Sequence, residues 1–125
     1  MAELKRDWVK YIRDGAKARY EKANECYICG TTEDLDFHHY STISILASNW
    51  LRDNEIKVET AEDAFFWRDK FIEEHQFELY EDAITLCRPH HEALHKIYGK
   101  NPKLVHSKKQ ARWVQRQRDK HRGMV

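Results

Sequence analysis

The densest group of reactive side chains is the stretch Cys87–His95, "CRPHHEALH", in which one cysteine and three histidines occupy nine positions. Cys87 and His90 have the spacing of half a structural zinc site, and Cys26 and Cys29 repeat that spacing earlier in the chain. Three thiolates and one imidazole are a donor set that binds zinc tetrahedrally. Each pair spans one tight turn, so a fold that brings the two pairs together would bind one Zn²⁺ ion. The sequence therefore predicts a structural zinc site.

The remaining histidines of this stretch have the spacing of a second metal site. His91 and His95 are four residues apart, so on a helix they project from one face with Cβ atoms about 5–6 Å apart. His38 and His39 lie near the end of "LDFHHY". Adjacent residues of a strand point to opposite faces, so both serve one site only if the strand ends or bulges there. We expect His38 to complete a site of three imidazoles and His39 to act as a general base.

Two other functions are compatible with parts of this pattern. His91–His95 fits the H-E-x-x-H motif of zinc proteases, in which Glu92 would be the base. That hypothesis leaves the cysteine pair and the His38–His39 pair without a role. The glycine and histidine that extend the motif in the largest such family are replaced by Tyr98 and Asn101. The other alternative is a non-catalytic zinc module that binds nucleic acid or protein.

The combined segments "CYICG", "LDFHHY" and "EDAITLCRPHHEALH" resemble the HNH, or ββα-metal, endonucleases, and the histidine arrangement is similar to that of the colicin-type DNases. The resemblance implies an α+β fold with a two-stranded hairpin packed on one helix around a divalent ion. It also implies metal-dependent hydrolysis of DNA phosphodiester bonds, by nicking or cleaving duplex DNA, that leaves 5′-phosphate and 3′-hydroxyl ends. The catalytic ion would be Mg²⁺, Mn²⁺, Ni²⁺ or Zn²⁺. By this resemblance, His39 of the present sequence takes the general-base position, and His38, His91 and His95 take the positions of the metal ligands.

The sequence departs from the family pattern at two positions. The fourth zinc ligand, usually a cysteine, is His90, which is chemically acceptable. The family's asparagine is replaced by Asp82, five residues before Cys87. An ionised Asp82 can accept a hydrogen bond and orient His39, but it cannot donate one. The resemblance therefore implies catalytic roles for His39 and Asp82 together.

The hydrophobic periodicity predicts the elements that position these residues within a single domain over residues 1–125. The core is expected over about 24–40 and 80–98, interrupted by an acidic helical insertion over about 41–79. Thr60 and Asp63 form a capping-box pattern, Gly30 permits the turn after Cys29, and Ser107 with Gln110 is expected to cap the last helix. We expect helices over 3–22 (with Leu4, Trp8, Tyr11 and Ile12 on one face), 42–52, about 60–75, about 90–98 and, basic in character, about 105–122, with strands over 35–40 and 83–87.

The net charge of +1 conceals a strong segregation along the chain. Residues 31–83 carry four basic and fourteen acidic groups, whereas residues 84–125 carry eleven basic and two acidic groups. The basic end is expected to bind DNA phosphates, and the acidic insertion is a candidate surface for a protein partner. The expected phosphate contacts are Lys108, Lys109, Arg112 and Arg116.

The sequence contains no apolar run that would indicate a signal peptide or a membrane span, because about 18 apolar residues are needed to cross a bilayer. The three cysteines are an odd number, and their spacing favours metal binding over disulfide formation. A cytoplasmic protein without membrane contact is therefore expected.

Overall fold

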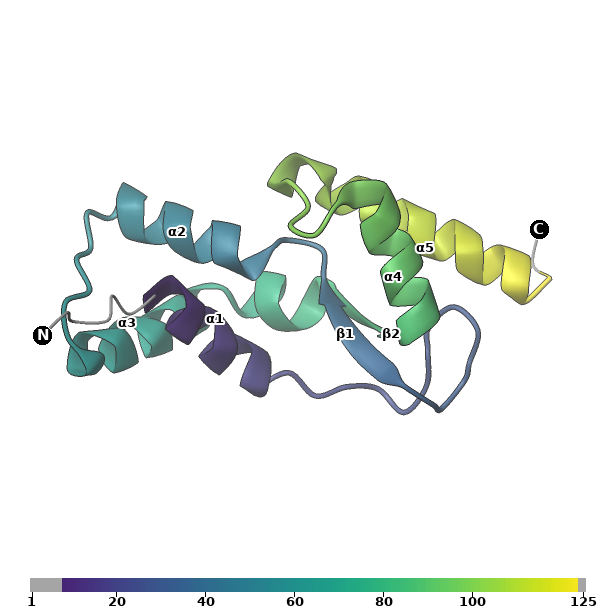
Figure 1. The fold of residues 1–125 in the computed structure, drawn as a ribbon, viewed down its shortest axis with the longest axis horizontal. Helices are drawn as coiled ribbons and strands as arrows, with labels where there is room; N and C mark the ends of the chain where they lie inside the picture. The colour runs from purple at the N-terminus through teal and green to yellow at the C-terminus, as the bar shows by residue number, and fades with distance from the viewer. Residues whose placement is uncertain (1–7, 124–125) are drawn as a thin grey trace, which may run out of the picture.

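The structure, a computed structural model, describes residues 8–123 and has the predicted α+β character. It contains one two-stranded antiparallel sheet among the described residues, with helices before, between and after the strands (Figure 1). In chain order the elements are α1 (Trp8–Ala18), β1 (Leu35–His39), α2 (Ile43–Asp53), α3 (Ala61–Glu74), a π-helical segment (Phe77–Glu81), β2 (Ala83–Cys87), α4 (Arg88–Tyr98), a 3₁₀ turn (Leu104–His106) and α5 (Ser107–His121).

The strands β1 and β2 pair without a bulge, with Leu35 opposite Cys87 and His39 opposite Ala83. The strands are not joined by a tight turn, because α2, α3 and the π-helical segment lie between them in the chain. Helix α4 starts directly after β2 and packs against both strands. The two predicted strands and the helix that follows them are therefore confirmed as one unit.

Two hydrophobic clusters surround this unit. Figure 1 shows α1, α2 and α3 gathered at one end of the molecule and α4 and α5 with the sheet at the other. The first cluster joins α1, α2, α3 and the π-helical segment through Ile12, Ala16, Ile43, Ala47, Phe71, Ile72 and Leu79. The second joins the sheet, α4, α5 and the cysteine turn through Cys26, Ile28, Tyr40, Leu86, Cys87, Leu94 and Val114.

The inserted helices agree with their sequence signals. Helix α3 begins with the predicted capping box: the Thr60 hydroxyl accepts from the Asp63 amide at 3.1 Å, and the Asp63 carboxylate accepts from the Thr60 amide at 3.3 Å. Helix α1 ends at Ala18 rather than at residue 22. The ring of Tyr20 packs instead on Phe37 at the sheet, 5.1 Å between centroids, which draws the chain out of the helix. The predicted helical positions 3–7, with Leu4, lie outside the described residues.

The predicted cap of the last helix is wrong. Ser107 is already the first residue of α5, and the N-cap position belongs to His106, which makes no side-chain capping bond. The 3₁₀ turn runs directly into the helix, and Gln110 is fully buried with its amide engaged elsewhere. At the other end of this connection, Gly99 follows the last residue of α4 with a φ of 88°, a conformation that glycine adopts readily.

None of the described helices is both long enough and apolar enough to cross a membrane.

Candidate metal centres and catalytic pocket

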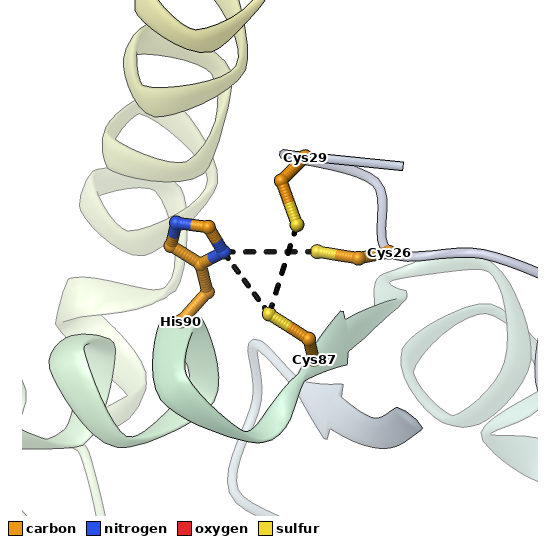
Figure 2. Close-up of side chains that lie close together, drawn as sticks. All are labelled: Cys26, Cys29, Cys87 and His90. Carbon is orange, nitrogen blue, oxygen red and sulfur yellow. Dashed lines mark hydrogen bonds between the residues drawn. The ribbon is translucent and has the colours of Figure 1, made fainter. Parts of the chain in front are cut away.

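The four predicted zinc ligands lie together at the start of α4 (Figure 2). Their donor atoms all fall within 4.8 Å of one another, with Cys29 Sγ 3.8 Å from Cys87 Sγ. His90 Nδ1 is 3.1 Å from Cys87 Sγ and 3.9 Å from Cys26 Sγ. Zn–S bonds of about 2.3 Å in a tetrahedron place two sulfur atoms ~3.8 Å apart. The four side chains therefore fit a zinc ion.

Backbone hydrogen bonds shape the cysteine turn. Gly30 adopts a φ of +76°, and its amide donates to the Cys26 carbonyl at 2.9 Å. Burial raises the pKa of the Cys26 thiol, but backbone hydrogen bonds at Cys29, Cys87 and Ile28 outweigh burial, so that the net pKa is lowered. Burial raises the pKa of Cys87 to about 11. A cation is the group that would hold both sulfurs as thiolates.

The second predicted ligand set also converges, at the end of the sheet. His38 comes from β1, and His91 and His95 come from one face of α4. His91 Nε2 lies 3.3 Å from His38 Nδ1 and 3.0 Å from His95 Nε2, and all three nitrogens fall within 4.8 Å of one another. Metal–nitrogen bonds of about 2.0–2.1 Å in a tetrahedron place two nitrogens ~3.3–3.4 Å apart. The three imidazoles thus have the separation of ligands to one ion.

The outer ring nitrogens fix the tautomer of each imidazole. His95 Nδ1 lies 2.7 Å from the Gly99 carbonyl, and His91 Nδ1 lies 3.3 Å from the Asp36 carboxylate. Both partners are acceptors, so these nitrogens carry the protons. The other ring nitrogen, Nε2, faces the inside of the cluster on both histidines and carries a lone pair.

His38 is oriented by the buried amide of Gln110. The Gln110 Nε2 group donates to the Tyr40 carbonyl at 3.1 Å, which identifies its Oε1 as the acceptor, 2.6 Å from His38 Nε2. His38 therefore carries its proton on Nε2 and presents the lone pair of Nδ1 inward. Burial lowers the pKa of His38 to about 3, which favours the neutral ring.

The inner nitrogen of His91 lies 3.3 Å from that of His38 and 3.0 Å from that of His95, with no proton between them, so their lone pairs repel unless a cation lies among them. Outer-ring hydrogen bonds of this kind are the usual support of histidines that bind metals. Burial also lowers the pKa of His91, so its ring is disposed to stay neutral, as a ligand must be. The donor set therefore fits a divalent metal ion.

His39 lies beside this cluster but faces the other side of β1. Its ring contacts Tyr20 and Phe37, at centroid distances of 5.5 and 5.4 Å. Its Nε2 donates to the Leu79 carbonyl at 2.7 Å, which leaves Nδ1 unprotonated. Burial lowers the pKa of His39 to about 4, so the ring is neutral near pH 7. Because β1 ends at His39, both His38 and His39 line one pocket without a bulge.

The expected hydrogen bond between Asp82 and His39 is not made within the part of the chain that the structure describes. The Leu79 carbonyl occupies Nε2 of His39 instead, and the Asp82 side chain bonds with Ser41. Burial, followed by the charge of Glu78, raises the pKa of Asp82. The catalytic role of Asp82 therefore stays a prediction.

The histidines open into a pocket of about 140 Å³ at the junction of the two hydrophobic clusters. Glu92, the base of the protease hypothesis, is exposed and does not line this pocket. The basic residues predicted to bind DNA are exposed on α5 and lie outside the lining as well. The pocket is lined by Arg13, Lys17, Phe37, His38, His39, Thr42, Ile43, Ser44, His91, His95, Lys100, Asn101 and Pro102.

Sequence reasoning missed most of the groups that support the histidines. Asp36 could have been found, because alternate residues of a strand share a face and Asp36 is two positions before His38. The Gln110 contact joins residues 72 positions apart, and no local pattern indicates it. The Leu79 carbonyl belongs to the π-helical segment, a rare conformation that often occurs at functional sites.

Comparison with known proteins supplies a family but no structural relative. No solved structure gives a significant match to the chain. The family model of the phage T5 nicking endonucleases, whose description is "Nicking endonuclease family", matches residues 1–123. Since this match covers nearly the whole sequence, the chain belongs to the nicking endonuclease family.

Proposed function

We propose that the chain is a metal-dependent endonuclease of the HNH, or ββα-metal, type that nicks duplex DNA. The family supports DNA as the substrate and cleavage as the activity. The observation that carries the metal dependence is that an acceptor lies at the outer ring nitrogen of His38, His91 and His95, so that the inner nitrogens are left with lone pairs that face one another. The catalytic unit is β1, β2 and α4, within one domain to which the insertion and the terminal helices belong.

A divalent ion held by His38, His91 and His95 would act as a Lewis acid, neutralising charge on the phosphate and on the leaving 3′ oxygen. Three imidazoles favour transition metals such as Zn²⁺, Ni²⁺ or Mn²⁺ over Mg²⁺. The zinc site of Cys26, Cys29, Cys87 and His90 has a structural role in this proposal, because all four ligand positions are filled by the protein.

His39 is the proposed general base. Its Nδ1 lone pair takes one proton from the attacking water, whose oxygen forms the new bond to phosphorus. The bond between phosphorus and the 3′ oxygen breaks, and that oxygen takes a proton from a solvent water to give a 3′-hydroxyl beside a 5′-phosphate, while His39 later releases its proton to solvent. The Leu79 carbonyl holds the proton on Nε2 and stabilises the imidazolium that forms on His39. Lys108, Lys109, Arg112 and Arg116 are proposed to contact phosphates away from the cut.

Relaxation of a supercoiled plasmid tests this proposal. Wild-type protein is expected to convert it to the open circle with Mn²⁺, Ni²⁺, Zn²⁺ or Mg²⁺, and chelator should stop the reaction. His39→Ala should lower the rate by about 10²–10⁴-fold, the usual contribution of general-base catalysis. Absence of cleavage with every ion would refute the proposal and favour a non-catalytic zinc module.

Glu92→Gln is the matched control for the protease hypothesis. Its side chain is exposed outside the pocket, so nicking should stay within about twofold of wild type. Loss of nicking in this variant, with retention in His39→Ala, would contradict the assignment of His39 as the base.

A further inference from the structure

We propose that α1 completes the catalytic pocket with a cationic wall, Arg13 and Lys17, which together with Lys100 binds the phosphodiester that lies over the histidines. This inference rests on the proposed function, because the anion is the group that the histidine site would cut. The wall lies outside the β1–β2–α4 unit and apart from the basic residues of α5.

The pocket lining has an unusual charge. It contains three permanent cations, Arg13, Lys17 and Lys100, and no carboxylate. Among residues 8–123 no carboxylate forms an ion pair with Lys17 or Lys100, and Arg13 pairs with its exposed neighbour Asp14 at 3.3 Å. In a chain with 21 acidic residues, three cations around one pocket whose lining holds no carboxylate point to an anionic ligand.

The fold fixes the direction of the α1 cations. Ile12 and Ala16 are fully buried against α2 and α3, which sets the rotation of the helix about its axis. Arg13 and Lys17 each follow one of these anchors and are four residues apart, so they project from one face. Both reach the pocket that β1 and α4 line from the other side.

Lys100 faces the same space from a connection that is tied down at two points. Just before it, the Gly99 carbonyl accepts from His95 at 2.7 Å. Just after it, the Pro102 carbonyl accepts from the Thr42 hydroxyl at 2.6 Å. The cations therefore stand on held backbone at two sides of the pocket, which suits a ligand that is gripped between them.

The wall also has an electrostatic consequence for the ion site. Burial and the neighbouring Arg13 lower the pKa of Lys17, and Asp14 opposes this shift. Cations in this pocket oppose a divalent ion on the histidines until a phosphodiester enters between them. Each of the two ligands should then strengthen binding of the other, because such coupling is reciprocal.

DNA binding by a non-cleaving protein tests the wall directly. We would measure binding of a 20-base-pair duplex (about two helical turns) by fluorescence anisotropy across a salt series, with every protein carrying His39→Ala. Lys17→Met and Arg13→Met should each weaken binding about threefold to tenfold and reduce the salt slope by about 0.9. Lys57→Met is the matched control, because this exposed lysine lies outside the pocket, and it should leave both values unchanged.

Titration of zinc-loaded protein with Ni²⁺ alone supplies a second readout. Lys17→Met should raise the affinity of the histidine site for Ni²⁺ while it lowers the affinity for DNA, an outcome that damage to the fold would not produce. If Lys17→Met binds DNA as the wild type does, or loses affinity for Ni²⁺ and DNA in parallel, the proposed role of the cationic wall is refuted. The binding measurements need no cleavage, so failure of the wild type to nick DNA would count against the proposed function and leave this test intact.

Discussion

Substitution of Gln110 by leucine tests whether the buried amide supports a metal ligand or only fills the core. Gln110 lies on α5, is fully buried, and connects His38 Nε2 at 2.6 Å with the Tyr40 carbonyl at 3.1 Å. Leucine has a similar volume but makes neither hydrogen bond. The substitution therefore leaves one buried donor and one buried acceptor without partners.

Two consequences of different size are expected. Each unsatisfied buried group costs about 1–3 kcal/mol, so the free energy of unfolding of the protein with an empty histidine site should fall by ~2–4 kcal/mol after partial repacking. Loss of the outer hydrogen bond also frees the proton of His38 to move to Nδ1, the nitrogen that faces the ion. Loss of such a support usually costs about 10–100-fold in metal affinity.

The assay is calorimetric titration of zinc-loaded protein with Ni²⁺, combined with urea unfolding of the same samples. Gln110→Glu is the comparison, because a carboxylate still accepts from His38 but cannot donate to Tyr40. It should lose stability and retain Ni²⁺ affinity better than Gln110→Leu. If Gln110→Leu is destabilised but binds Ni²⁺ as the wild type does, the glutamine is a core residue and the orienting role is refuted.

Three further outcomes are expected. Cys29→Ser should remove one bound zinc per chain and lower the melting temperature by about 10 °C in a calorimetric scan; an unchanged zinc content would contradict the site. Asp82→Ala should reduce plasmid nicking far less than His39→Ala, since no hydrogen bond joins the two residues; equal losses would show a catalytic carboxylate. Burial lowers the pKa of His39 from an ordinary value of ~6.5 to about 4. Between those values the unfolded chain binds more protons, so stability falls as pH falls; His39→Gln should flatten the slope by up to ~1.4 kcal/mol per pH unit in urea titrations, and an unchanged slope would count against a neutral buried ring.

The two candidate metal sites could be predicted because their geometry is mostly local. Cys26 with Cys29 and Cys87 with His90 are pairs within single turns, and His91 with His95 is one helical turn. Only the convergence of these pieces required the fold, and the short strands with a following helix gave a reason to expect it. The assignment of His90 rather than His91 to the cysteines follows from the rotation of about 100° between adjacent helical residues.

The supporting groups could not be predicted because they come from distant segments and from the backbone. The Leu79 carbonyl depends on a π-helical segment, and the Gln110 amide on where α5 packs. Asp82 was expected to orient His39, but the Leu79 carbonyl accepts from Nε2 of that ring instead. The pattern of Ser107 and Gln110 wrongly indicated a helix cap. Gln110 is buried in the interior instead, and no local signal in the sequence reveals this.

Helix α4 links the two candidate metal centres through consecutive residues. His90 faces the cysteines, and His91 faces His38, so the same turn of helix contributes to both sites. A zinc ion bound to Cys87 and His90 would fix the start of α4 against the cysteine turn and thereby set the rotation of His91 and His95. The outer partners Asp36 and Gly99 then hold these rings from the two ends of the helix. If zinc binds at Cys87 and His90, we expect the geometry of the proposed catalytic pocket to depend on an ion that touches no substrate, because a sheet of only two strands gives the three imidazoles little other support.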